Sequence, residues 1–357
     1  MSSMHTIENA IGPDRTSFDL LKDKFTNKAL GIEMSYAPHM YHQGYIGSCV
    51  SNAVASAYRY ALQRQGQVNN QPIDFLPSRL FLYYVARIPT ANVEVNGSNT
   101  RGNYYADLVK TPPTTGILNN DTGCQIREVI RILDRLGAPP ESQHIVRWDQ
   151  DTWPYTYIPG ITDSTEYDAL SQDDKDLVDK LAVVAVKSHL EDTALAAQRP
   201  HDKAFLACKQ YTDLHYARPM EKDYHCWKQC IANGYPIVFA IDDYPTFQDS
   251  ITTNTHVAAT PTPGSSPGPD EAVSGHAMLA VGWNDTMDDD NGGHGCFKVQ
   301  NSWGDKIGDK LSGGFCWIPY AWLTTPSPWH PGFMMTNSPW VLVDQKAQTV
   351  SPKVDAP

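Results

Sequence analysis

Residues 43–62 read QGYIGSCVSNAVASAYRYAL. Ser48 has a side chain suited to a helix N-cap, and after it apolar residues recur at steps of three and four, at Val50, Ala53, Val54, Ala57, Tyr58, Ala61 and Leu62. This spacing predicts a helix with one buried face that begins at Cys49 and ends near Gly66. The first turn of a helix presents unpaired amide N–H groups and the positive end of the helix dipole. Cys49 is therefore a candidate nucleophile, because these groups favour its thiolate form.

A thiolate nucleophile needs a neighbouring base, and His276 has the most suitable local sequence among the twelve histidines. It directly precedes the apolar run 277–283, and a second such run covers 296–303. The residues between the runs, 284–295, are polar, acidic and rich in glycine. This pattern predicts two buried strands that form an antiparallel hairpin.

The register of this hairpin decides which side chains can meet across it. If Trp283 faces Cys296, then His276 lies opposite Trp303 and diagonally across from Asn301. Diagonal neighbours on paired strands are close enough for a side-chain contact. The pattern therefore predicts that Asn301 can hold the imidazole ring of His276.

The order and local sequence of four polar residues resemble the papain family of cysteine peptidases, in which a glutamine stands six positions before the nucleophile. Here these residues are Gln43, Cys49, His276 and Asn301. The resemblance spans roughly residues 43 to 343. It implies that the Gln43 side chain and the Cys49 backbone N–H form an oxyanion hole. It further implies that His276 is the base, that Asn301 orients it, and that Trp303 shields their hydrogen bond from water.

Two glycines are candidates for substrate binding. Gly123 stands before an expected helix at 126–136, where the family binds the substrate backbone through a glycine. Gly275 directly precedes the proposed base and leaves a small position that could widen a pocket. The chain also departs from the family, because Ile46 stands where many secreted members have a disulfide cysteine.

The resemblance implies an α+β fold with two lobes, one helical and one formed by an antiparallel, barrel-like sheet, with the active site in the cleft between them. The expected organisation is an N-terminal arm at 1–41, a mainly helical lobe at 42–160, an acidic, partly helical insertion at 161–200, a β-rich lobe at 201–343 and a loose tail at 344–357. The arm is either a short inhibitory propeptide or a segment that wraps the β-rich lobe.

The predicted function is hydrolysis of peptide bonds through a Cys49 thioester, with His276 as acid and base and with no cofactor. A peptide or protein is the expected substrate, and the choice between endopeptidase and exopeptidase stays open. Two alternatives also stay open. The same residues could transfer the acyl group to an amine, as a transpeptidase or transglutaminase does, or the chain could be a binding or structural protein that keeps the fold without turnover.

Composition excludes several other classes. The 357 residues carry a formal net charge of −12, which argues against a nucleic-acid partner. No apolar run is long enough to span a bilayer, and the N-terminal sequence lacks a secretory signal pattern. A cytoplasmic location, or one within a particle, is expected, with secretion by a non-signal route left open.

The seven cysteines form no recognisable disulfide framework, although Cys296 and Cys316 could approach across neighbouring strands. Residues His225, Cys226 and Cys230 lie near one another in sequence but do not complete a zinc site. The acidic residues between 285 and 290 lack the ligand spacing of a calcium loop. No metal site is therefore expected.

Overall fold

The computed structural model describes residues 15–27, 32–37, 39–44, 46–70, 75–96, 118, 120–141, 171–172, 185–186, 189–190, 196–208, 214–252, 256–260, 274–288, 293–304, 306–307, 310–311, 313–330 and 332–344. Residue contacts divide the chain into two compact units. The sheet unit comprises Met1–Tyr41, Ser56–Asp74 and Asp213–Pro357, and the helical unit comprises His42–Ala55 and Phe75–Thr212. Most of the expected insertion at 161–200 and nearly all of the tail lie outside the described residues.

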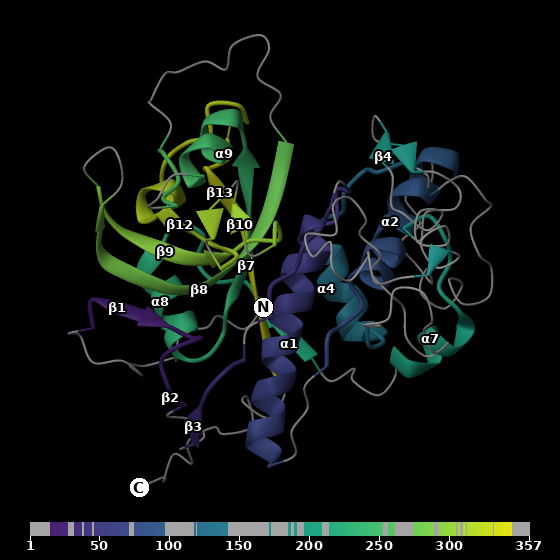
Figure 1. Cartoon of the computed structure of the whole chain (residues 1–357), viewed down its shortest axis with the longest axis horizontal. Coiled ribbons are helices and arrows are strands. Elements are labelled where there is room, and N and C mark those ends of the chain that lie inside the picture. Colours follow the sequence, from purple (N-terminus) through teal and green to yellow (C-terminus); the bar gives the residue numbers. More distant parts are fainter. Residues whose placement is uncertain are drawn as a thin grey trace, which may run out of the picture. The chain divides into compact units, whose positions relative to one another are not determined.

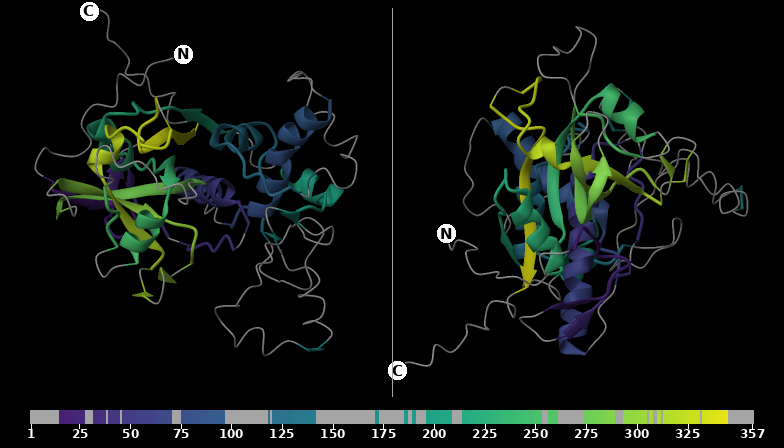
Figure 2. Two further views of the ribbon diagram at one scale, coloured as in Figure 1. Left: turned by 90° about the horizontal axis from the view of Figure 1, so that it is seen from above. Right: turned by 90° about the vertical axis from the view of Figure 1, so that its left-hand side faces the viewer.

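The sheet unit is built on a seven-stranded antiparallel sheet (Figure 1). Its main path is β12 (Phe315–Pro319), β9 (His294–Gln300), β8 (Ser274–Asp288), β7 (Ile237–Asp243), β13 (Thr336–Asp344) and β6 (Leu214–Ala217), and β1 (Ser17–Asp19) pairs with β8. This path is open, since β12 and β6 at its two ends do not pair with each other among the described strands. Figure 2 shows that the strands twist relative to one another, as is usual for sheets.

Aromatic side chains form much of the core of the sheet unit. Helix α8 (Tyr224–Ala232) packs against β7 and β8, and its Trp227 lies 5.2 Å from Phe239 and 5.3 Å from Phe297, measured between ring centroids. Asp223 caps this helix by accepting hydrogen bonds from two backbone N–H groups in its first turn. The strands that α8 covers, β7 and β8, consist mostly of buried residues.

Strand β1 of the N-terminal arm belongs to this sheet. Phe18 on β1 contacts the Trp283 ring at 5.1 Å, and the Lys298 ammonium lies 2.6 Å from the Asp19 carboxylate. Gly282 allows β1 to approach β8, because a Cβ atom at this position would lie only 2.5 Å from the Phe18 carbonyl oxygen. Residues 17–19 are therefore an integral strand of the sheet unit. A second hairpin follows, formed by β2 (Phe25–Asn27) and β3 (Ile32–Met34).

Helix α1 (Cys49–Asn69) begins in the helical unit and continues into the sheet unit. In the sheet unit, the Tyr60 hydroxyl donates to the Gln300 side chain at 3.0 Å. The guanidinium of Arg64, which is fully buried, donates to the Gly234 and Leu342 carbonyl oxygens at 2.9 and 3.2 Å. These contacts fix the second half of α1 beside the strand that leads to Asn301.

The helical unit contains the first turns of α1 together with α2 (Arg79–Asn96), α4 (Ile126–Arg135) and α7 (Asp202–Ala207). Helix α4 packs against α2, and its buried residues include Ile126, Val129, Ile130 and Leu133, as the spacing predicts. The unit also contains the short pair β4 (Ala185–Val186) and β5 (His189–Leu190). In the sheet unit, α9 (Pro245–Ile251), the 3-10 helix Tyr320–Leu323 and the pair β10 (Lys306–Ile307) and β11 (Lys310–Leu311) complete the described elements.

The prediction for α1 is correct at its start and wrong at its end. The helix begins at Cys49 but continues past Gly66 to Asn69. The Gln67 side chain explains the extension, because it exchanges hydrogen bonds with the backbone of Ser35 at 2.7 and 3.0 Å and so holds the last turn. Asn70 then takes a left-handed conformation, with φ of 51°, which is a common way to end a helix.

Candidate active site

His276 and Asn301 form a buried pair within the sheet unit. His276 lies on β8 and is paired with Ile241 of β7, and Asn301 directly follows β9. His276 Nε2 lies 2.8 Å from Asn301 Oδ1, and the two residues are only 4% and 2% exposed. The Asn301 oxygen also accepts a hydrogen bond from the Ser302 backbone N–H at 2.7 Å. The imidazole ring is therefore held in one orientation by a side chain that is itself fixed.

The hairpin reaches this contact by a different register from the one expected. Trp283 pairs with Phe297 and not with Cys296, so this part of the prediction is wrong. An irregularity between Ala280 and Gly282 shifts the pairing of β8 with β9 by one residue. Nearer to His276, Leu279 pairs with Gln300, and this pair agrees with the predicted register. Strand β9 ends at Gln300, so the expected cross-strand pair of His276 and Trp303 does not form in the backbone.

Aromatic rings cover the His276–Asn301 pair. The indole of Trp303 stacks on the His276 ring, with centroids 5.1 Å apart and planes inclined by 29°. Phe247 of α9 meets Trp303 edge-on at 6.1 Å. Because hydrogen bonds are stronger where water is excluded, this cover strengthens the bond that orients the imidazole.

The nucleophile candidate occupies the first turn of α1 in the helical unit. Cys49 is 7% exposed, and the Ser48 carbonyl oxygen accepts the helical hydrogen bond from the Asn52 N–H at 3.0 Å. Gln43 Nε2 donates to the Ile46 carbonyl oxygen at 3.1 Å, and the Ser48 N–H donates to the same oxygen at 2.8 Å. The Ile46 carbonyl oxygen thus accepts two hydrogen bonds within the loop that precedes Cys49.

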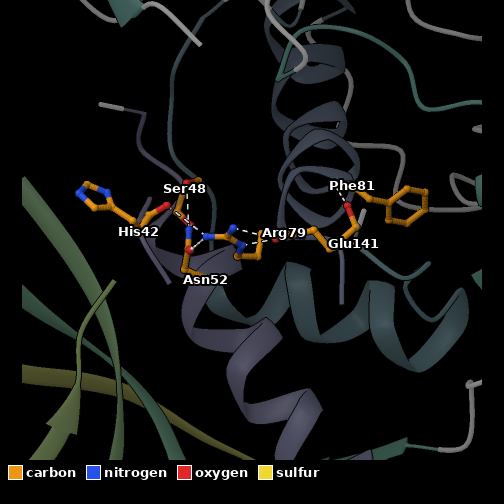
Figure 3. Close-up of polar contacts among 7 residues, drawn as sticks. His42, Ser48, Asn52, Arg79, Phe81 and Glu141 are labelled. Carbon is orange, nitrogen blue, oxygen red and sulfur yellow. Dashed lines mark hydrogen bonds and ion pairs between the residues drawn. The ribbon is translucent and has the colours of Figure 1, made fainter. Parts of the chain in front are cut away.

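A buried ion pair holds this loop from the side (Figure 3). Arg79, the first residue of α2, donates to both carboxylate oxygens of Glu141 at 2.8 and 2.9 Å. Its remaining Nη1 donates to the His42 carbonyl oxygen at 3.1 Å and to the Asn52 side chain at 2.8 Å. Arg79 thus ties the residue before Gln43 to α1. Removal of either charge would leave the other buried without its partner, which is costly.

The two substrate-binding candidates have different surroundings. Gly123 has φ of 68°, a left-handed conformation that favours glycine, and its backbone N lies 3.3 Å from where a Cβ on Gly47 would stand. Gly123 therefore lies beside Gly47, in the loop that precedes Cys49, within the helical unit. Gly275 is exposed on β8 opposite Asp242, and a Cβ added there would meet nothing within 4 Å. An added side chain at this position would therefore fit without displacing its neighbours.

The structure thus gathers the candidates into two sets. The helical unit holds Gln43, Cys49 and Gly123, and the sheet unit holds His276, Asn301, Trp303 and Gly275. Sequence reasoning missed three contributors to these sets: Arg79, Asp121 and Phe247. The side-chain partner of Arg79, Glu141, is 62 positions away in the sequence, so no local signal indicated the contact.

The cysteines form no disulfide, and the possible bridge between Cys296 and Cys316 is absent. In the register between β9 and β12, Cys316 lies opposite Val299 while Cys296 lies opposite Pro319, so the two thiols do not face each other. Within the described ranges, no group of three or more His, Cys, Asp and Glu residues is placed to hold a metal ion.

The cysteines outside the site differ in how readily they ionise. A hydrogen bond from the Cys230 thiol lowers the pKa of Cys226 to about 6, against the opposing effect of partial burial. Burial raises the pKa of the Cys124 and Cys316 thiols to about 12. The pKa of Cys208 is also raised by burial, and that of Cys230 by its hydrogen bond to Cys226 and by burial. Of these five thiols, Cys226 is therefore the one expected to react most readily with alkylating reagents.

Comparisons with known proteins show what the chain is similar to. No family model matches the chain. An uncharacterized peptidase C1-like protein of Acanthamoeba polyphaga mimivirus is 25% identical over 281 residues, which cover 79% of this chain and 64% of that protein. The chain thus spans slightly less than two thirds of this relative's length.

Among solved structures, the chain resembles xylellain, a cysteine protease from Xylella fastidiosa, with a TM-score of 0.53, 22% identity and coverage of 91% of both chains. This likeness shows a shared fold of helices with an antiparallel sheet. Among the helices of the described chain, none has the length and apolar character needed to cross a membrane. The chain is therefore similar in sequence to a peptidase C1-like protein and shares its fold with a cysteine protease.

Proposed function

We propose that the chain is a cysteine peptidase that hydrolyses peptide bonds through a thioester on Cys49. The observation that carries this proposal is the buried contact of 2.8 Å between His276 Nε2 and Asn301 Oδ1 under the Trp303 ring. A histidine held through one ring nitrogen presents the other in a defined direction, which is what a general acid and base requires. Nδ1 is therefore the atom proposed to exchange a proton with the Cys49 sulfur.

The proposed reaction has two stages. The Cys49 thiolate attacks the carbonyl carbon of the substrate, and the imidazolium of His276 protonates the leaving amine as the peptide C–N bond breaks. Neutral His276 then takes a proton from water, whose oxygen attacks the thioester and releases the acid product with the thiolate restored. Both stages pass through a tetrahedral intermediate with a negatively charged oxygen.

The Gln43 side chain and the Cys49 backbone N–H are the proposed donors to that oxygen. Two observations support this role. Cys49 N–H belongs to the first turn of α1, at the positive end of the helix dipole, which favours a negatively charged oxygen. The contact of Gln43 Nε2 with the Ile46 carbonyl oxygen holds the side-chain amide within the same loop.

Peptides or proteins are the proposed substrates, and Gly123 and Gly275 are the proposed substrate-binding positions. The left-handed φ of Gly123 leaves its backbone uncovered by a side chain and able to hydrogen-bond an extended peptide. Gly275 directly precedes His276 on β8, so a residue at this position stands beside the proposed base.

A labelling experiment tests the assignment of the nucleophile. At pH 7, iodoacetamide is expected to modify Cys49 and Cys226, and to spare the buried thiols whose pKa is raised, because only thiolates react quickly. A peptidyl epoxide is expected to modify Cys49 alone, since that reaction also needs the substrate site. Peptide mapping by mass spectrometry, with Cys226→Ser as control, measures both. Epoxide on Cys226 but not on Cys49 would refute the assignment.

We also propose that the N-terminal arm inhibits the peptidase through residues 1–14. Residues 17–19 are unsuited to this task because they pair with β8 as strand β1. Deletion of residues 1–14 is expected to raise kcat/KM several-fold and to leave the melting temperature unchanged, because β1 is kept. A deletion through residue 23 removes β1 and is expected to lower the melting temperature. Equal kcat/KM for the full chain and the shorter deletion would show that the arm does not inhibit.

A cytoplasmic or particle-borne location is proposed with the activity. Its support is that none of the seven cysteines takes part in a disulfide, as is usual for proteins of reducing compartments.

A further inference from the structure

Asp121 contacts the centre of the nucleophile loop in the helical unit. Both oxygens of its carboxylate accept hydrogen bonds from the Gly47 backbone N–H, at 3.0 and 2.9 Å. Gly47 stands two residues before Cys49, and the space beside it is narrow, because an added Cβ would lie 3.3 Å from an Asp121 oxygen. The carboxylate therefore fits closely against the loop backbone and forms a charge-assisted bond with it.

The peptide unit between Ile46 and Gly47 is held from both sides. Its N–H donates to Asp121, while its carbonyl oxygen accepts from Gln43 Nε2 at 3.1 Å and from the Ser48 N–H at 2.8 Å. Because a peptide unit is planar, the direction of its N–H determines the direction of its C=O. Asp121 thus controls the orientation of the carbonyl group that holds the Gln43 side chain.

Helix α2 in turn holds Asp121. The Tyr83 hydroxyl donates to the Asp121 carboxylate, and burial raises the pKa of Tyr83 far above its ordinary value, so that the hydroxyl remains a donor. Arg87, one turn later on the same helix face, donates to the Leu118 and Asn120 carbonyl oxygens at 2.5 and 3.0 Å. Tyr83 therefore holds the Asp121 carboxylate, and Arg87 holds the backbone just before Asp121.

We propose that Asp121 is a positioning residue for the oxyanion hole, acting through the Ile46–Gly47 peptide unit on Gln43. This inference rests on the proposed peptidase function. Asp121 does not touch the reacting atoms in this scheme. Without its carboxylate, the Ile46–Gly47 peptide is free to rotate, the Ile46 carbonyl turns away, and the Gln43 amide loses the contact that aims it. Displacement of a donor by about 1 Å is enough to cost on the order of 10²-fold in rate.

Asp121→Ala and Asp121→Asn test this role, with Asp202→Asn as the matched control. Asp202 is also in the helical unit, and it pairs with Arg199 with 79% of its side chain exposed. Asp121→Ala is expected to lower kcat by about 10- to 100-fold with little change in KM, because it weakens stabilisation of the transition state. Asp121→Asn keeps one acceptor oxygen and is expected to lose less, by about 3- to 10-fold. The control is expected to match the unchanged chain.

Two reagents separate positioning from general damage. A peptide aldehyde forms a thiohemiacetal whose oxygen occupies the oxyanion hole, so its affinity is expected to fall in parallel with kcat. Iodoacetamide alkylates Cys49 without forming an oxyanion, so the alkylation rate is expected to stay equal or to rise, since the variants remove a negative charge near the thiolate. A partly unfolded protein would lose both properties together.

Specific outcomes would overturn the inference. They are unchanged kcat in Asp121→Ala, a rise in KM alone, or a parallel loss of alkylation and turnover. The failure of the peptidase proposal is distinguishable, because then the unchanged chain itself would neither hydrolyse peptides nor bind the aldehyde.

Discussion

Replacement of Cys49 by alanine is expected to lower kcat/KM for peptide hydrolysis by about 10⁴-fold or more, because the thioester can no longer form. The substitution removes the sulfur that forms the thioester, and no neighbouring group replaces it. Cys124, the other thiol of this part of the helical unit, is held protonated because burial raises its pKa to about 12. Steady-state kinetics on a peptide library, with burst-phase measurement on an ester substrate, would measure the loss.

The fold is expected to survive the Cys49 substitution. Alanine is the best helix former, and position 49 lies at the first turn of a 21-residue helix that is anchored elsewhere by Tyr60 and Arg64. Cys226→Ala is the matched control, since the pKa of Cys226 is lowered to about 6 and the residue lies on α8, away from the proposed residues in sequence. Hydrolysis that persists in Cys49→Ala, or that is lost in Cys226→Ala, would contradict the proposed nucleophile.

Replacement of His276 by alanine is expected to lower kcat/KM by about 10³-fold or more. The variant loses both the acceptor of the Cys49 proton and the donor to the leaving amine. It also leaves space under the Trp303 ring, so thermal unfolding must be compared, and His276→Gln fills that space while removing the imidazole. His294→Ala is the control, because His294 is mostly exposed and contacts Asp288 only at the surface. Retention of more than a tenth of the activity in both His276 variants would exclude His276 as the base.

The start of α1 and the contact of His276 with Asn301 could be anticipated because their signals are local. An N-cap residue followed by a helical apolar pattern marks Cys49, and two apolar runs around a polar segment mark the hairpin. The general fold followed from the same residues through their resemblance to a known family, and the shared fold with xylellain agrees with it.

The features that sequence reasoning missed depend on residues far apart in the chain. The hairpin register shifts between Ala280 and Gly282, where β1 lies against β8 and Gly282 admits the Phe18 carbonyl. The end of α1 is extended by a contact between Gln67 and Ser35. A pattern within one segment carries no information about such partners.

Asp121 illustrates the same limit at the candidate site. In the sequence it is one of several polar residues before Thr122 and Gly123, where an aspartate ordinarily indicates a turn. Its bonds to Gly47 and Tyr83 join positions 74 and 38 residues away. Only the folded chain shows that this carboxylate binds the loop that precedes Cys49.

The central claim is that Cys49 and His276 exchange a proton, and the pH dependence of Cys49 alkylation tests it most directly. Alkylation by iodoacetamide would be followed at Cys49 by mass spectrometry between about pH 4 and 10, in the unchanged chain and in His276→Ala, both carrying Cys226→Ser. If the two groups form a pair, the midpoint of alkylation is expected to move upward by about one pH unit or more in His276→Ala, because a protonated imidazole stabilises the thiolate. Superimposable profiles for the two proteins would contradict the account.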